Sequence, residues 1–357
     1  MSWKSDLEKW YSVPVYKPGI SPEESKKIVG DKNFLNLQSN ENLFIPSELI
    51  KKLAENALLN IDLRLYPKEI TTALTEKLAK INNLEKENVI LGHGADQMIE
   101  SVLNIFRNKK KVFLHKPTYS YYKIAAMSYG LKVITDEYVN ETSLNFESIN
   151  KSSPNLVFIC NPNNPTGHVI PKGEIEELLK NKDIVVVLDE TYAEISGVTS
   201  NQLLNDYENL IILRTFSKAY GLAGLRIGYA LASGILSDVL KRVQSPFPVS
   251  SFSAYVALLA LDRIDVFKKY WNEALKVREW FEKQLDEGVI RSKSSSYFLT
   301  LSFKVSSKAA FTELLSHGYI TRVIEPFGRF LNPLRMNLAP KDLIEDLPGL
   351  INQINKN

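Results

Sequence analysis

The sequence predicts an α/β protein, with a large domain built on a mostly parallel sheet covered by helices and a smaller α+β C-terminal domain. The first observation is the length, because 357 residues exceed the size at which one hydrophobic core stops growing. The second is that short β-branched runs alternate with amphipathic helical patterns between about residues 46 and 240. The third is that this alternation stops after residue 250.

Six apolar runs are predicted to form the strands of the large domain, and they span residues 88–91, 111–114, 132–135, 156–160, 184–188 and 210–213. Helical patterns lie between them. In residues 96–106 the apolar side chains fall on one face, and a helix over residues 173–180 follows Pro171. Strands that alternate with helices require crossover connections, so they indicate a parallel sheet covered on both faces.

The C-terminal part is predicted to begin with one long helix over residues 251–285. The elements predicted after it are a strand at 297–303, a helix at 308–316, strands at 319–323 and 334–338, and a final helix. The first residues are rich in proline and irregular. We therefore expect a large domain at 46–250, a small domain at 251–357, and an N-terminal segment, 1–45, that packs across the active site and the small domain.

Composition and charge exclude several classes of protein. The net charge is +3, and the longest basic block is residues 109–111, so a nucleic-acid surface is not expected. The lone cysteine, Cys160, permits no intrachain disulfide, which fits a reducing compartment. Charges stand where a signal peptide would have its apolar core, and the aliphatic run at 184–188 is too short for a membrane span. We expect a cytoplasmic protein with no nucleic-acid or membrane partner.

Polar segments follow five of the predicted strands, at the edge where an open parallel sheet binds its ligands. In chain order they are residues 92–96 (GHGAD), 117–119 (PTY), 161–167 (NPNNPTG), 189–192 (DETY) and 217–218 (SK). Lys218, on a turn that leaves a strand, can be desolvated and attack a carbonyl. Ser217 and Arg226 suit a phosphate. Each of these residues could also have a purely structural role. Lys218 could be a solvated surface residue, and Asp189 could be a helix N-cap.

Taken together, these motifs resemble the fold-type I, pyridoxal-phosphate-dependent aminotransferases, and within them the histidinol-phosphate aminotransferase branch. The likeness covers nearly the whole chain, and its further motifs are residues 16–19 (YKPG), 39–42 (SNEN), 66–67 (YP) and 334–335 (LR). The resemblance implies a transaminase of histidine biosynthesis with small-molecule substrates. It would move an amino group between histidinol phosphate, whose keto form is imidazole acetol phosphate, and 2-oxoglutarate, which becomes glutamate.

The resemblance assigns the catalytic roles to Lys218, Asp189 and Tyr192. Lys218 would hold pyridoxal phosphate as a Schiff base and would then carry a proton between the substrate Cα and the cofactor C4′. Asp189 would pair with the pyridine nitrogen and keep it protonated. Asn164 and Tyr192 would hydrogen-bond the phenolic oxygen, and Tyr119 would stack on the ring.

The cofactor's phosphate would lie at the helix start formed by Gly94, Ala95 and Asp96. Backbone N–H groups donate hydrogen bonds there, and the helix dipole favours an anion. Ser217 and Arg226 would add side-chain donors.

The tyrosine that matches Tyr66 reaches the phosphate of the neighbouring subunit in the family, so the resemblance implies a homodimer with shared active sites. A Tyr-Pro turn that lines the core is the other interpretation of this position.

Substrate binding is assigned by the same resemblance to Tyr16, Asn40, Glu41, Arg322 and Arg335, and no metal is expected. Two arginines can serve a planar carboxylate and a tetrahedral phosphate alike. For Arg322 a solvated strand position is the alternative.

Two departures from the family pattern bear on the substrate. Leu43 stands where a proline usually follows the Asn-Glu-Asn motif, and residues 336–340 (MNLAP) differ from the typical Ile-Thr-Val-Gly-Thr. Alternative activities are an aromatic amino acid aminotransferase and a threonine-phosphate decarboxylase, although the His-Gly-Gly-Asn pattern of the latter is absent.

Two interpretations would assign the chain to a different class of protein, and the sequence argues against both. A dinucleotide-binding enzyme would need a glycine where Gln97 stands. A catalytically dead relative would not be expected to keep Lys218, Asp189 and Arg226 together. His93 has no assigned role.

Overall fold

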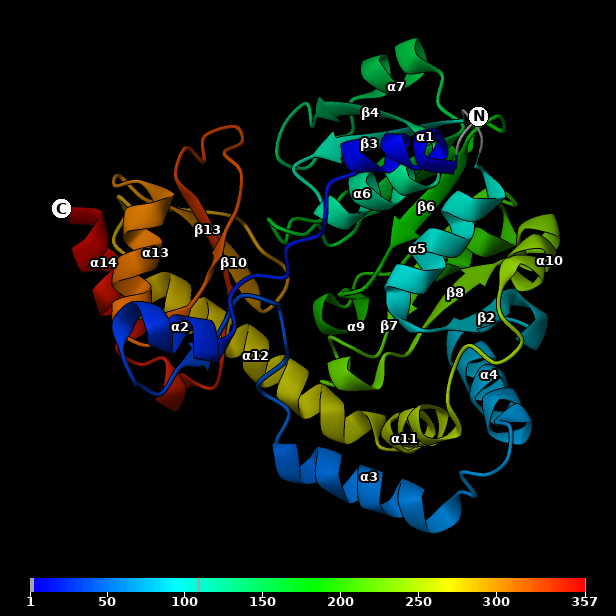
Figure 1. Cartoon of the computed structure of the whole chain (residues 1–357), viewed down its shortest axis with the longest axis horizontal. Helices are drawn as coiled ribbons and strands as arrows, with labels where there is room; N and C mark the ends of the chain where they lie inside the picture. The colour runs from blue at the N-terminus through cyan, green and yellow to red at the C-terminus, as the bar shows by residue number, and fades with distance from the viewer. Residues whose placement is uncertain (1–2, 108–109, 357) are drawn as a thin grey trace.

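The computed structural model describes residues 3–107 and 110–356, and within them the largest sheet has seven strands (Figure 1). In spatial order they are β2 (Val89–Gly92), β8 (Gly228–Ala232), β7 (Leu210–Thr215), β6 (Val185–Asp189), β5 (Leu156–Cys160), β3 (Lys111–Lys116) and β4 (Lys132–Glu137). β8 runs antiparallel to β2 and β7, and the remaining neighbours are parallel. The predicted mostly parallel sheet is confirmed. The prediction missed β8.

Helices cover both faces of this sheet. One face packs against α5 (Gly94–Ile105), α6 (Ser120–Ser128) and α10 (Gly234–Val243), whose apolar side chains form one core with the strands. The opposite core includes side chains of α3 (Ser47–Asn60), α4 (Lys68–Asn82), α7 (Phe146–Ser152), α8 (Lys172–Leu179), α9 (Ala193–Ser196) and α11 (Ser251–Asp262). The strands therefore end in loops between two packed layers, and the carboxyl edge of the sheet stays open for a ligand.

A smaller antiparallel sheet lies toward the C-terminus. Among the described residues it has four strands, in the order β12 (Arg322–Val323), β13 (Pro333–Asn337), β10 (Phe298–Ser302) and β9 (Ile290–Arg291). α13 (Ser307–Ser316) contacts this sheet and α14 (Leu347–Lys356). α12 (Ile264–Gln284) runs from it toward the larger sheet, where it meets α11 (Figure 1).

Two of the predicted C-terminal elements are wrong in their extent. The expected single helix over 251–285 is α11 followed by α12, because Arg263 leaves the helical conformation at φ −112° and ψ 24°. The expected strand at 319–323 is two short strands. β11 (Tyr319–Ile320) pairs with β1 (Leu35–Asn36), whereas β12 pairs with β13.

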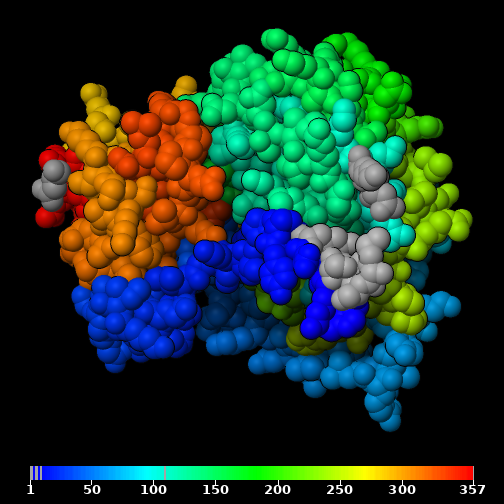
Figure 2. Space-filling view, turned by 45° about the horizontal axis from the view of Figure 1, so that its top comes forward, coloured from blue at the N-terminus to red at the C-terminus, as the bar shows by residue number. Residues whose placement is uncertain are grey.

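The N-terminal residues connect the regions around the two sheets. α1 (Trp3–Glu8) comes first, α2 (Pro22–Val29) contacts α13, and β1 pairs in parallel with β11. In Figure 2 the dark-blue N-terminal residues lie across the face of the molecule, below the teal part and next to the orange part. The predicted domain boundaries at residues 45 and 250 stay a prediction. No helix within residues 3–107 and 110–356 is long and apolar enough to cross a bilayer.

Candidate active site

A cavity of about 590 Å³ lies where β5, β6 and β7 end. The predicted site residues that line it are Tyr16, Asn40, Ala95, Asp96, Tyr119, Asn164, Asp189, Tyr192, Ser217, Lys218, Arg226, Arg322 and Arg335. They come from strand ends and helix starts around the larger sheet, from the N-terminal segment, and from β12 and β13. The structure therefore brings together side chains that lie more than 300 residues apart in the sequence.

Lys218 lies three residues beyond β7 and is half-buried. Its Nζ donates a hydrogen bond to the Ser39 carbonyl oxygen at 2.8 Å. The pKa of Lys218 is lowered to about 8, first by burial and then by the Arg335 charge, whereas the Glu41 charge opposes the shift. A lysine with this pKa is neutral in about one molecule in ten at pH 7, far more often than an exposed lysine, and the neutral amine is the nucleophile.

Asp189 is the last residue of β6 and is buried. Its Oδ2 accepts a hydrogen bond from the Tyr122 hydroxyl at 2.6 Å, and its Oδ1 accepts from the Thr191 N–H at 3.0 Å and the Thr191 hydroxyl at 2.5 Å. Burial raises the pKa of Asp189, and these hydrogen bonds oppose that rise. Tyr122 was not among the predicted site residues, because nothing in the pattern of α6 distinguishes it from the neighbouring tyrosines.

The start of α5 forms an anion-binding corner. Gly94 begins the helix at φ +77°, and the next backbone N–H groups, of Ala95 and Asp96, have no carbonyl partner within the helix. Arg226 reaches the same corner, with its NH2 2.9 Å from Asp96 Oδ2. Gly228 on β8 allows the close approach, since a Cβ there would lie 2.7 Å from Ala95 N.

Arg335 lies at the other end of the cavity. Its NH1 donates to Asn164 Oδ1 at 2.6 Å, and its NH2 donates to the Gln38 carbonyl oxygen. Its buried Nε has no hydrogen-bond partner in the described part of the chain. Arg322 faces Arg335 in the β12–β13 register and donates to the Lys17 carbonyl oxygen at 2.6 Å. Two neighbouring guanidiniums, one with an unused donor, favour an anionic ligand.

Aromatic side chains, among them Tyr16, Tyr119 and Tyr192, also line the cavity. The Tyr119 hydroxyl donates to Asp96 Oδ1 at 3.3 Å, and its ring meets Tyr16 edge-on with centroids 6.5 Å apart. The Tyr192 hydroxyl accepts a hydrogen bond from Asn40 Nδ2 at 2.9 Å. Asn40 was expected at the substrate, and its amide nitrogen here contacts a predicted cofactor residue.

Three predicted residues, Gly94, Glu41 and Tyr66, are missing from the described lining of the cavity. Gly94 lies behind Arg226, because a Cβ on it would be 2.9 Å from the guanidinium NH2. Glu41 acts through its charge on Lys218. Tyr66 is 79% exposed and stacks on Phe247 with ring centroids 4.6 Å apart, so it does not reach the cavity of its own chain.

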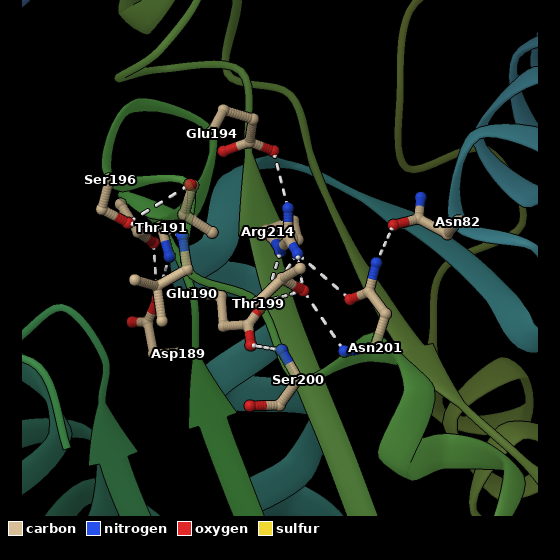
Figure 3. Close-up of polar contacts among 12 residues, drawn as sticks. Asn82, Asp189, Glu190, Thr191, Glu194, Ser196, Thr199, Ser200, Asn201 and Arg214 are labelled. Atoms are coloured by element: carbon tan, nitrogen blue, oxygen red, sulfur yellow. Dashed lines mark hydrogen bonds and ion pairs between the residues drawn. The ribbon is translucent and has the colours of Figure 1, made fainter. Parts of the chain in front are cut away.

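Beside Asp189 lies a buried ion pair that the sequence analysis also missed (Figure 3). Arg214 on β7 donates from Nε and NH2 to Glu190 Oε2 at 3.0 and 2.5 Å, and from NH1 to Glu194 Oε1 at 2.9 Å. Its NH2 also donates to the Thr199 hydroxyl at 2.7 Å. The pair joins the end of β6 to the end of β7. It thereby links the end of the strand that carries Asp189 to the strand that leads to Lys218. Two features of the sequence could have indicated this ion pair. They are the acid directly after Asp189 and the arginine near the end of an apolar strand.

The donor set fits the cofactor that the resemblance implies. A lysine of lowered pKa, a buried carboxylate and an anion-binding helix start with Ser217 and Arg226 are the groups that pyridoxal phosphate requires. A desolvated lysine that shares a cavity with a buried carboxylate, at this edge of an open α/β sheet, defines a group-transfer enzyme that handles carbonyl compounds.

The sequence pattern of the family "Aminotransferase class I and II" matches residues 32–347, and the chain belongs to this family. Among curated proteins it is similar to the histidinol-phosphate aminotransferase of Ruminiclostridium cellulolyticum, with 33% identity over 86% of this chain and 89% of the relative. The histidinol-phosphate aminotransferase of Thermoanaerobacter pseudethanolicus is 34% identical over 88% and 93%.

A solved structure with the same fold is the histidinol-phosphate aminotransferase of Sinorhizobium meliloti in complex with pyridoxal-5'-phosphate. It has a TM-score of 0.86 and 22% identity, and the match covers 98% of this chain and 97% of that chain.

Proposed function

We propose that this protein is a pyridoxal-phosphate-dependent transaminase that moves an amino group between histidinol phosphate and 2-oxoglutarate in histidine biosynthesis. The observation that carries the proposal is one cavity that joins Lys218, with its lowered pKa, to the adjacent guanidiniums of Arg335 and Arg322. An amine of lowered pKa and two guanidiniums that would hold an anionic substrate thus line the same cavity. The printed names of the similar curated proteins support the same activity.

Pyridoxal phosphate, when bound, supplies an aldehyde and an electron-accepting ring. Lys218 would hold the aldehyde carbon and afterwards give and take a proton there. Asp189 would hold a proton on the ring nitrogen, and Tyr192 would donate a hydrogen bond to the phenolic oxygen. Ser217 and Arg226 would hold the phosphate together with the helix start of α5.

The cofactor assignment is tested by absorption. The purified protein, supplied with pyridoxal phosphate, is expected to develop visible absorption that is stable to gel filtration and trapped by borohydride reduction. Lys218→Ala, which lacks the amine, is expected to lose the covalent attachment. A wild-type protein that stays colourless with excess cofactor would rule the assignment out.

The substrate assignment is tested by comparing kcat/KM for histidinol phosphate, phenylalanine and threonine phosphate, with CO₂ followed in parallel. We expect histidinol phosphate to be preferred and no CO₂ to be released. Preference for phenylalanine would favour the aromatic aminotransferase. Release of CO₂ from threonine phosphate would favour the decarboxylase. Either result would overturn the proposed substrate and leave the cofactor assignment intact.

We also propose a homodimer in which Tyr66 completes the partner's phosphate site. Leu63, Leu65 and Tyr66 are each at least 65% exposed, and Tyr66 stacks on the half-exposed Phe247. Such an apolar patch on an isolated chain favours burial against a second copy. Sedimentation equilibrium is expected to give a dimer, and a monomer with full activity would contradict the role of Tyr66. The buried free thiol of Cys160 supports a further proposal, that the protein is cytoplasmic.

A further inference from the structure

Asn40 has a backbone conformation that few residues other than glycine adopt. Its φ is +52°, in the left-handed region, and its side chain is buried. Two buried side chains hold this conformation. The Asn40 N–H donates to Asn337 Oδ1 at 3.1 Å, and the Asn40 carbonyl oxygen accepts from the Tyr297 hydroxyl at 2.6 Å. Both polar groups of the Asn40 backbone are therefore fixed from the side of the smaller sheet.

The Asn40 side chain points its amide nitrogen at Tyr192. Nδ2 lies 2.9 Å from the Tyr192 hydroxyl oxygen and donates a hydrogen bond to it. A hydroxyl that accepts in this way still has its own proton to donate. Burial raises the pKa of Tyr192, so the phenol keeps that proton. Both residues line the cavity, so the free donor of Tyr192 is available to a ligand inside it.

We propose that Asn40, fixed by Asn337, is a positioning residue that directs the Tyr192 proton into the cavity, toward the phenolic oxygen of the bound cofactor. The inference rests on the proposed function, because the cofactor is the acceptor of that proton. Asn40 acts through Tyr192.

Asn337 belongs to the segment in which this chain departs from the family pattern, since an asparagine stands where a threonine is typical. It lies two residues after Arg335 on β13, so the two side chains leave the strand on the same face. Arg335 contacts the Gln38 carbonyl oxygen, and Asn337 contacts the Asn40 N–H. The Asn337 N–H also donates to the Leu37 carbonyl oxygen at 2.9 Å. One strand thus positions both the substrate arginine and the residue that orients Tyr192.

The test is a spectroscopic pH titration of the lysine-bound cofactor without substrate. A hydrogen bond donated to the phenolic oxygen stabilises negative charge there. The oxygen then stabilises less strongly the proton on the nitrogen that joins Lys218 to the cofactor. The midpoint pH at which this proton is lost is therefore lower when the hydrogen bond is present. Asn40→Gly removes the amide and accepts positive φ without strain. We expect it to raise the midpoint pH of the absorption change by about 0.5 to 1 unit, the effect of one hydrogen bond. Tyr192→Phe is expected to raise it by at least as much.

The double variant Asn40→Gly/Tyr192→Phe is expected to titrate like Tyr192→Phe alone, because in the proposal Asn40 acts on the cofactor through the Tyr192 hydroxyl. The groups whose charges act on Tyr192, namely Arg335, Cys160 and Asp189, are the same in every variant. A purely structural role would lower the melting temperature and leave the midpoint unchanged. Asn337→Ala tests the same proposal indirectly, because it removes the hydrogen bond that fixes the Asn40 backbone. We expect it to raise the midpoint pH by less than Asn40→Gly does.

Three results would overturn the proposal. One is a wild-type midpoint in both Asn40→Gly and Asn337→Ala. Another is a shift that adds fully to that of Tyr192→Phe. The third is a fall in the midpoint, which would mean that the Tyr192 hydroxyl donates to Asn40. All three results require that the bound cofactor absorbs visible light. If the proposed function is wrong, no such absorption develops, so the two failures can be told apart.

Discussion

Replacing Arg214 by methionine is expected to destabilise the protein strongly, because it leaves buried carboxylates without their cation. The side chains of Arg214 and Glu190 are only 6% and 1% exposed, and Glu194 is 12% exposed. Methionine restores much of the volume of the arginine stem but none of its donors. The loss therefore reports the missing charge and hydrogen bonds.

Removing one partner of a buried ion pair costs about 3–5 kcal/mol. At an unfolding entropy of about 2.1 cal/mol/K per residue, a chain of 357 residues loses about 4–7 °C in Tm for this change. A matched control is Arg329→Met, since the Arg329 Nε lies 2.7 Å from Glu141 Oε1 but both side chains are about half exposed. We expect that control to change Tm by no more than about 1 °C.

The destabilisation is also expected to depend on pH. Burial raises the pKa of Glu190, and the Arg214 charge opposes that rise. Without Arg214 the folded-state pKa of Glu190 rises further above its ordinary value of 4.5. The folded variant then binds a proton that the unfolded chain has released, so its stability falls as pH rises above about 4.5. The Tm difference from wild type should therefore be larger at pH 7.5 than at pH 5.5.

Differential scanning calorimetry or dye-based melting at the two pH values measures both effects. The double variant Glu190→Leu/Arg214→Met is expected to recover part of the loss, because it removes the carboxylate that Arg214→Met leaves unpaired. The reasoning fails if Arg214→Met loses no more Tm than Arg329→Met, or if its loss is the same at both pH values.

Three further predictions concern the cofactor. Gly228→Ala is expected to abolish cofactor retention after dialysis, because its Cβ would lie 2.7 Å from Ala95 N; retention like that of the wild type would contradict the close approach. Because the pKa of Lys218 is about 8, the rate of cofactor uptake by apoprotein is expected to rise about tenfold from pH 6 to 7 and to level off above pH 8.5, and a rate independent of pH in stopped-flow absorption would refute this. Tyr122→Phe removes a 2.6 Å hydrogen bond to Asp189 and is expected to weaken cofactor binding about tenfold in equilibrium dialysis, whereas an unchanged affinity would show that the other hydrogen bonds suffice.

The parallel strands were predictable because each is buried on both faces and therefore appears as a continuous apolar run. β8 was not, since Gly-Tyr-Ala-Leu-Ala is poor in β-branched residues and its glycine serves the approach of α5. The break at Arg263 was missed for a related reason. No glycine or proline marks it, and apolar residues continue on both sides, so the periodicity alone indicates one helix.

The residues of the site also fall into those that the sequence could predict and those that it could not. Residues that directly follow a strand could be placed at the cavity from the sequence, since topology alone puts them there. Tyr122, Arg214 and Asn337 could not be placed, because their roles depend on Asp189, Glu190 and Asn40, which lie 67, 24 and 297 residues away in the chain. The direction of a side chain across such a distance is fixed only by packing.

The pairing of the N-terminal segment with residues between 319 and 337 has a consequence for synthesis on the ribosome. Leu35 pairs with Tyr319, and the Asn40 N–H bonds Asn337, a separation of 297 residues. Long-range contacts of this kind form late, because the intervening chain must first be ordered. A nascent chain can assemble the larger sheet before residue 337 has emerged, yet Asn40 lacks its anchor until then. The cavity is therefore completed only after residue 337 has left the ribosome.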